Sequence, residues 1–284
     1  MQTYLDCVPC LLRQAVEASR MIGATEMVQE TLVRQIMQEL ASGDFSQSPP
    51  QLAQSIHRHI RAVTGQQDPY HEIKGRFNTL ALHILPQLEE IVSRSQHPLT
   101  TAIRLAIAGN VIDMGISAAL QDSQVMDAID HALDAPLQGD PKELAQAIAG
   151  AKQILYLTDN AGEIVFDRLL LQQLPLERVT VAVKGSPVIN DATREDAKIA
   201  GIDQLATLID NGSDAPGTIL SDCSERFRRH FEQANLIIAK GQGNYESLSG
   251  CAKQIFFILK AKCPVIAKDL DCKVGDLILR HSTK

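Results

Sequence analysis

The sequence predicts an α/β protein in which a helical N-terminal part precedes a C-terminal part built on a parallel sheet. Two observations predict it. Before about residue 150, most segments carry apolar residues at the helical period, and after it short β-rich runs alternate with helical stretches. A third observation, polar clusters at the ends of three of these runs, indicates where a ligand binds.

The N-terminal part is predicted to be helical because its apolar residues recur every three or four positions. The segments that show this pattern are 11–18, 32–40, 50–64, 70–95 and 101–108.

A domain boundary is expected near Gly139-Asp140-Pro141, where a turn-forming stretch separates the two patterns. It divides the chain into a mainly helical domain, 1–140, and an α/β domain, 141–284.

The C-terminal part is predicted to contain strands separated by helices, which is the pattern of βαβ units. The runs are fully apolar and do not alternate with polar residues, so we expect helices on both faces of the sheet. The predicted strands are Ile154–Leu157, Val179–Val183, Leu236–Ala239, Ile255–Leu259 and Val265–Ala267.

Composition argues against several classes of protein. The 284 residues carry a net charge of −7 with no basic stripe, so we expect no nucleic acid partner. No apolar run approaches the roughly 20 residues of a membrane helix, and the N-terminus lacks a signal-peptide core. Six cysteines are too few for a disulfide scaffold. We expect a cytoplasmic protein without a membrane partner, and the sequence predicts no oligomeric state.

Three predicted strands end in polar clusters that share one kind of chemistry. In parallel α/β sheets ligands bind beyond the carboxyl ends of the strands, and neighbouring strands bring such clusters together. The clusters are Thr158 to Glu163, Lys184 to Thr193 and Lys240 to Glu246.

The first two clusters supply oxygen ligands for a cation. Asp159, Asn160 and Asp191 offer two carboxylates and a carboxamide, which suit Mg²⁺ or Mn²⁺. Asp159 or Asp191 by itself is more typical of a helix N-cap. The presence of three such clusters favours a shared site.

The second and third clusters supply groups suited to a phosphate. Lys184 and Lys240 are point cations, and Gly241 and Gly243 allow backbone amides, up to that of Asn244, to approach an anion. A lone surface lysine has no such role, so this prediction depends on the clusters meeting.

A fourth polar element comes from the helical part. Asn110 and Asp113 are three residues apart and therefore share one helical face. Either this is a helix end with a capping asparagine, or the helical part leans over the strand edge and donates these groups to the pocket.

Two common nucleotide motifs are not matched. The stretch from Gly241 begins like a dinucleotide fingerprint, but Glu246 stands where the last glycine belongs. A P-loop pattern is also missing. A Rossmann-type oxidoreductase is therefore disfavoured.

Together, the stretches GNVIDMG, DNAGEIVFD, KGSPVINDAT and KGQGNYESL resemble the damage-control phosphatases, the metal-dependent family once called domain of unknown function 89. The short N-terminal type of that family also has an early CxxC, here Cys7-Val8-Pro9-Cys10. The resemblance extends over nearly the whole chain. It implies a helical N-terminal domain packed on a Rossmann-like core with a mostly parallel sheet.

The resemblance also implies an enzyme: a phosphatase that hydrolyses small phosphorylated metabolites, such as sugar phosphates or damaged cofactor precursors, with a divalent ion (Mg, Mn, Co or Ni). The family's metal ligands carry over to Asp159, Asn160 and Asp191. Its phosphate-binding lysine corresponds to Lys240, and its pocket border corresponds to Asn110 and Asp113.

Two mechanisms remain open, because either Asp159 or a water held at the metal ion could attack phosphorus. Glu163 or Asp113 would then act as general base. A non-catalytic protein that binds a phosphorylated metabolite is the alternative function. The two carboxylates favour catalysis, since they would repel a phosphate unless a cation lay between them.

The Cys7-x-x-Cys10 pair opens a predicted helix and is half of a zinc site. Cys272 is the best candidate to complete it. A redox pair or simply buried thiols are the alternatives.

Overall fold

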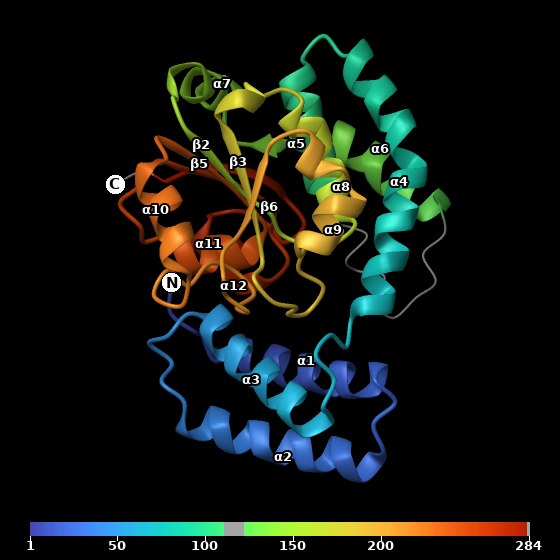
Figure 1. Ribbon diagram of the computed structural model, residues 1–284, viewed down its shortest axis with the longest axis vertical. Helices are drawn as coiled ribbons and strands as arrows, with labels where there is room; N and C mark the ends of the chain where they lie inside the picture. Colours follow the sequence, from blue (N-terminus) through green and yellow to red (C-terminus); the bar gives the residue numbers. More distant parts are fainter. Residues whose placement is uncertain (111–121, 283–284) are drawn as a thin grey trace.

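Within the described residues, a seven-stranded sheet carries helices on both faces, and the helices α1 to α3 form a separate layer below it (Figure 1). The structure is a computed structural model, and it describes residues 1–110 and 122–282. This architecture confirms the predicted α/β fold with a mostly parallel sheet and a helical N-terminal part.

The sheet has the strand order β1-β7-β6-β5-β2-β3-β4, and neighbouring strands are parallel except for the antiparallel pair β6 and β7. From β2 the chain builds outward through β3 to β4, then crosses to β5 on the other side of β2. Such a reversal is a topological switch point, where open α/β sheets bind ligands. The strands are β1 (Leu137–Gln138), β2 (Ile154–Leu157), β3 (Val179–Val183), β4 (Thr207–Asp210), β5 (Leu236–Lys240), β6 (Ile255–Lys260) and β7 (Leu277–His281).

The helices of the first half are α1 (Cys7–Met21), α2 (Glu26–Ser42), α3 (Pro49–Thr64), α4 (His71–Arg94), α5 (Pro98–Ala108), α6 (Asp122–Asp134) and α7 (Pro141–Gly150). Those of the second half are α8 (Glu163–Leu171), α9 (Arg194–Ile199), α10 (Glu225–Gln233), α11 (Gln242–Leu248) and α12 (Pro264–Asp269), with short 3₁₀ helices η2 (Leu176–Arg178) and η3 (Ile202–Gln204). Within the described ranges, none of these helices is both long and apolar enough to cross a bilayer.

The central strands are buried on both faces, as their apolar runs predict. Successive side chains alternate between faces, so Tyr156 joins the apolar cluster beneath α4 to α8, whereas Leu155 and Leu157 join the cluster beneath α10 to α12. All four residues of β2 are buried, which places this strand at the centre of the core.

The helical half divides between two apolar clusters. α1 to α3 pack on one another through residues such as Leu32, Ile36 and Ile56, which are almost fully buried. By contrast, α5 packs on α8 and on strand β6, and α4 packs on α5, α8 and α9, so that residues such as Leu88 and Ile103 join the same apolar cluster as the sheet. The helices that follow α3 therefore bring parts of the N-terminal half to the sheet edge. The predicted domain boundary at residue 140 stays a prediction.

One predicted strand is wrong. Val265–Ala267 lies within helix α12, which has Pro264 in its first turn. Proline there is a helix-start signal, and an apolar run of three residues is too short to indicate a strand. The sequence prediction also missed β1, β4 and β7. β1 has two residues, β4 is only partly buried, and β7 runs antiparallel at the end of the described chain.

We predict that Gly139→Ala destabilises the fold. Gly139 has a φ of 123°, and a methyl group there would overlap the carbonyl oxygen of Leu279 in the neighbouring strand β7. Urea denaturation should show the free energy of unfolding lowered by about 2 to 3 kcal/mol. In the control Gly150→Ala, the new methyl group meets no atom within 4 Å, so the change should stay below about 1 kcal/mol. Equal unfolding free energies for the two variants would contradict this prediction.

Candidate functional site

The three polar clusters predicted at strand ends meet at one edge of the sheet. Strand β2 lies between β3 and β5, and Leu157 at its carboxyl end pairs with Ala182 on one side and Ala239 on the other. The residues that follow these three strands therefore lie next to one another at the switch point. This is the convergence on which the sequence prediction depends.

The loops after β2 and β3 are joined by backbone hydrogen bonds. Asn160 and Asp191 form an isolated antiparallel bridge, flanked by a 2.8 Å bond from Ala161 N to the Asn190 carbonyl and another from Ala192 N to the Asp159 carbonyl. Opposed residues in such a bridge direct their side chains to the same side. The structure thus brings two of the predicted metal ligands face to face.

Asp159 lies beside this bridge, within reach of the same side chains. Its Oδ2 accepts hydrogen bonds from Asn160 Nδ2 at 2.9 Å and from Asn110 Nδ2 at 3.4 Å. Asn160 and Asp191 are buried, whereas Asp159 is half-buried. Asp159 is therefore the most accessible of the three.

Glu163 lies at the centre of a buried hydrogen-bond network. Its Oε2 accepts bonds from Asn110 Nδ2 at 2.7 Å and Asn160 Nδ2 at 3.2 Å, and its Oε1 accepts one from Lys240 Nζ at 2.8 Å. Both amide NH₂ groups thus face carboxylates. Asn110 is contributed by the residues just after α5, so one residue of the helical part reaches the carboxylates at the strand edge. Its Oδ1 is buried and has no hydrogen-bond partner in residues 1–110 and 122–282.

Lys240 is fully buried and donates to three acceptors. Nζ lies 2.8 Å from Glu163, 2.5 Å from Asp167 and 3.0 Å from the carbonyl oxygen of Ala106 in the last turn of α5. Burial by itself would lower the pKa of this ammonium group, but the two carboxylates outweigh burial and raise it. An ammonium group has three protons, so direct contact with a phosphate would require Lys240 to release one of these partners.

Asp167 is a member of this network that the sequence analysis did not identify. Its Oδ1 accepts bonds from Lys240 and, at 2.8 Å, from the hydroxyl of Tyr156. Burial raises the pKa of the Asp167 carboxyl to about 6, with a further contribution from Glu163, while Lys240 and Tyr156 act in the opposite direction. A signal was present in the sequence, because Asp167 follows Glu163 by four residues and so shares its helical face.

Lys184 lies on the opposite side of the site, with its Nζ 3.3 Å from Asp191 Oδ2 and donating to the Gly217 carbonyl. A small cavity of about 10 Å³ adjoins it, which is room for one water molecule. Thr158, Asn211 and Thr218 supply further polar groups to its wall. Asn211 and Thr218 follow β4, the edge strand that the sequence analysis missed, so their contribution was missed as well.

The predicted glycines allow close backbone packing. A methyl group at Gly241 would overlap the Asp159 carboxylate, and the Gly241 amide donates to the Ile258 carbonyl at 3.0 Å. A methyl group at Gly243 would lie 2.7 Å from the Pro216 carbonyl oxygen. The Gly241 amide is therefore engaged within the sheet, although the sequence analysis predicts it as an anion contact.

Asn244 is buried, and its side chain holds neighbouring loops together. Nδ2 donates to the carbonyl oxygens of Lys240 at 2.8 Å and Thr158 at 3.1 Å, and Oδ1 accepts a bond from the Thr218 hydroxyl at 2.7 Å. Its predicted role in substrate binding stays a prediction, and Asp113 lies outside the described residues.

The carboxylates at this strand edge outnumber the ammonium groups. Asp159, Glu163, Asp167 and Asp191 face two ammonium groups, Lys184 and Lys240, so the ionised groups carry a net charge of −2. One divalent cation would balance it. The predicted ligand set is two carboxylates and an amide. In the described part of the chain, no group of three or more His, Cys, Asp or Glu side chains is arranged to hold a metal ion.

The described residues also show no zinc site at the Cys7-x-x-Cys10 pair. Cys7, Cys10 and Cys272 are free thiols, and no such metal-holding group includes them among the described residues. Burial raises the pKa of Cys7, with Glu246 and Cys263 adding to the shift.

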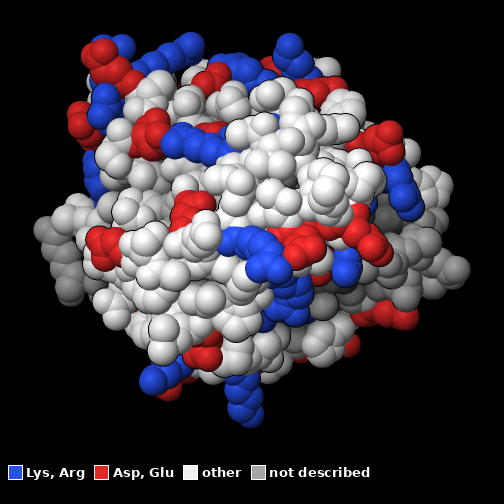
Figure 2. All heavy atoms as spheres, turned by 90° about the horizontal axis from the view of Figure 1, so that it is seen from below, with Lys and Arg blue, Asp and Glu red and all other residues white. Residues whose placement is uncertain are grey.

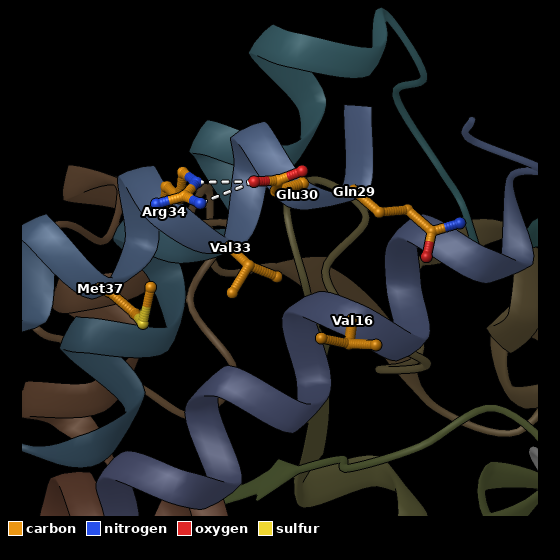
Figure 3. Close-up of a pocket in the computed structure, with 6 residues that line it drawn as sticks. All are labelled: Val16, Gln29, Glu30, Val33, Arg34 and Met37. Atoms are coloured by element: carbon orange, nitrogen blue, oxygen red, sulfur yellow. Dashed lines mark hydrogen bonds and ion pairs between the residues drawn. The ribbon is translucent and has the colours of Figure 1, made fainter. Parts of the chain in front are cut away.

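Other surface features lie away from the strand edge. A groove of about 300 Å³ between α1 and α2 has Val16, Val33 and Met37 in its wall and an exposed Glu30–Arg34 ion pair beside them (Figure 3). Figure 2 shows acidic and basic side chains interspersed over the lower face, with uncharged surface between them. The prediction that nucleic acid is not a partner stays a prediction.

The sequence matches the family described as "Damage-control phosphatase ARMT1-like domain" over residues 3–278. This chain belongs to that family. The resemblance drawn from the four motifs is thereby confirmed. This chain is 36% identical to a protein of Archaeoglobus fulgidus named "Damage-control phosphatase", with 96% of this chain and 97% of that protein covered.

Two further relatives extend this finding. A damage-control phosphatase of Pyrococcus horikoshii is 33% identical, with 98% of this chain and 97% of the relative covered. An uncharacterized protein of Methanocaldococcus jannaschii is 38% identical, with 96% of this chain and 93% of that protein covered. The crystal structure of a DUF89 family protein from Pyrococcus horikoshii superposes with a TM-score of 0.90 at 31% identity, over 100% of both chains. This chain therefore shares its fold with a DUF89 family protein, and the names of two relatives support a phosphatase.

We predict that the stability difference between the protein and its Asp167→Asn variant depends on pH. The folded-state pKa of about 6 lies above the ordinary 3.8, so the folded protein binds the Asp167 proton more tightly than the unfolded chain does. The contribution of Asp167 to stability is complete below about pH 4 and is lost as pH rises through 6.

Urea denaturation of both proteins from pH 4 to 8 measures this difference. The free energy of unfolding of the wild type relative to the variant should fall between pH 4 and 6 and then level off. A difference that stays constant, or that rises over this interval, would contradict the prediction.

Proposed function

We propose that this protein is a divalent-metal-dependent phosphatase that hydrolyses small phosphorylated metabolites. The observation that carries the proposal is the meeting of Asp159, Asn160 and Asp191 at the switch point, in a site with a net charge of −2. The relatives named damage-control phosphatases support the reaction class.

The residues present fit a divalent ion of the Mg²⁺, Mn²⁺, Co²⁺ or Ni²⁺ type. Asp159 and Asp191 would supply carboxylate oxygens. The amide NH₂ of Asn160 faces Asp159 and Glu163, so its Oδ1 is the atom left to face the ion. When bound, the ion supplies positive charge that lowers the repulsion between these carboxylates and a phosphate and stabilises charge on the phosphoryl oxygens.

Lys184 is the lysine that the geometry favours for a phosphate oxygen. Nζ donates to the Gly217 carbonyl and forms an ion pair with Asp191, which leaves at least one proton for a substrate oxygen or a water molecule. Lys240, which donates to three acceptors, instead fixes Glu163 and Asp167. We propose that its role in the reaction is to hold this network in place.

Asp159 is the carboxylate best placed to act on the substrate, because it is the accessible member of the set. Asn110 and Asn160 hold its Oδ2 in one orientation. In the covalent route, Asp159 attacks phosphorus, the bond from phosphorus to the ester oxygen breaks, and the departing alcohol takes up a proton. Water then hydrolyses the aspartyl phosphate. In the alternative route, water attacks phosphorus directly.

Glu163 is less suited to proton transfer than the sequence analysis predicts. It is buried, and its two oxygens already accept three hydrogen bonds, from Lys240, Asn110 and Asn160. A carboxylate held in this way orients the two amides.

We predict that Asp159→Asn and Asp191→Asn each lower kcat/KM for an aryl phosphate by at least about 100-fold, because loss of a metal ligand should exceed loss of an outer-shell partner. Release of inorganic phosphate would be measured with Mg²⁺, Mn²⁺, Co²⁺ and Ni²⁺, and with a chelator. Asp203→Asn, an exposed aspartate on η3, is the matched control and should keep full activity.

Full activity in either site variant, or equal activity with chelator and metal, would overturn the metal site. If the wild type binds inorganic phosphate but releases none from a panel of phosphorylated metabolites with any of the four metals, the protein is a binding protein and the proposed reaction is wrong.

A further inference from the structure

A buried amide in helix α4 joins the two loops that carry the proposed metal ligands. Asn78 is fully buried, its Oδ1 accepts a 2.7 Å bond from Gly162 N, and its Nδ2 donates to Asp196 Oδ1 at 2.9 Å. Gly162 follows Asn160 by two residues, and Asp196 follows Asp191 by five. One side chain from the helical half therefore contacts the segment behind each ligand.

Asp196 in turn is hydrogen-bonded to the loop that carries Asp191. Its Oδ2 accepts bonds from the backbone N and the hydroxyl of Thr193, both at 2.8 Å. Thr193 is two residues after Asp191, and it pairs with Lys184 in an isolated parallel bridge. Movement of Asp196 would therefore move the end of the loop on which Asp191 lies.

Lys74, one turn before Asn78 on α4, balances the charge of Asp196. Its Nζ lies 3.2 Å from Asp196 and 3.0 Å from Asp68, and all but about 3% of its side chain is buried. The pair Lys74 and Asn78 thus anchors Asp196 from one helix.

The contact at Gly162 has a local reason. Gly162 immediately precedes α8, where the first backbone N–H groups have no partner within the helix. Its φ of 76° turns its N–H toward α4, where Asn78 Oδ1 accepts it. Because these groups are buried, loss of the acceptor would leave a donor without solvent to replace it.

We propose that Asn78 is a positioning residue of the phosphatase site, which sets the spacing between the loop of Asp159 and Asn160 and the loop of Asp191. The inference rests on the proposed function, since it concerns the metal site proposed there. It assigns a role to a helix outside the strand-end clusters.

The test is Mn²⁺ binding to the full-length protein without substrate, measured by calorimetry. Asn78→Ala should raise the Kd for Mn²⁺ by about 10- to 100-fold, the usual effect of losing a residue that orients metal ligands. In the double variant with Asp196→Ala, the two effects should be less than additive, because both residues act through one bridge.

Leu88→Ala is the matched control, because Leu88 is fully buried on the same helix but packs in the apolar cluster. It should lower the melting temperature of the metal-free protein while the Kd for Mn²⁺ stays within about twofold of wild type. A purely structural Asn78 would behave in the same way.

Asn78→Asp is the second variant if Asn78→Ala does not fold. It keeps the acceptor for Gly162 N but places a carboxylate against Asp196, so it should also raise the Kd by about tenfold. A wild-type Kd in either folded variant would overturn the positioning role. A wild-type protein that binds no Mn²⁺ would instead overturn the metal site and with it the proposed function.

Discussion

The site depends on how buried charge is balanced at the switch point of the sheet. Charged groups in an interior are costly unless they are paired and hydrogen-bonded. Lys240, between Glu163 and Asp167 at the end of β5, meets this requirement for two of the four carboxylates. It ties the central strand, α5 and α8 to one point. Near the remaining pair, Asp159 and Asp191, lies the ammonium group of Lys184, 3.3 Å from Asp191, and it is at this part of the strand edge that we propose a cation site.

The two lysines therefore lie in different surroundings, although the sequence presents them alike, each at the end of a strand and before a glycine. Lys240 is enclosed by α5 and α8, and its three protons are taken by acceptors of the protein. Lys184 is next to the loop after β4, beside a cavity with room for one water molecule. Their different surroundings follow from which helices and loops cover each strand end.

The helical half contributes to the site at two levels. Asn110, just after α5, reaches the carboxylates directly. Asn78 on α4 reaches only the backbone and the capping residue behind the ligand loops. Because α4 and α5 share one apolar cluster with α8 and the sheet, these contacts are supported by the main core. The α1 to α3 layer has its own cluster, which also packs against Ile73 of α4 and Ile189 in the loop after β3.

The apolar runs of four of the five predicted strands could be identified from the sequence because complete burial leaves a clear compositional signal. Short or edge elements such as β4 lack that signal, and the run at Val265 was misassigned because helix and strand are not distinguishable over three residues. Asp167 was identifiable from its spacing to Glu163. Asn78 was not, since a single asparagine in an amphipathic helix carries no pattern of its own.

The sequence by itself determined the fold class, the family and the set of polar strand ends, because periodicity and short motifs are local properties of the chain. Only the tertiary structure decided which lysine is enclosed, which amide faces which carboxylate, and that one helix joins the two ligand loops. Those outcomes depend on contacts between residues that are far apart in sequence, such as Asn78 with Gly162 and Lys240 with Ala106, and no local pattern specifies them.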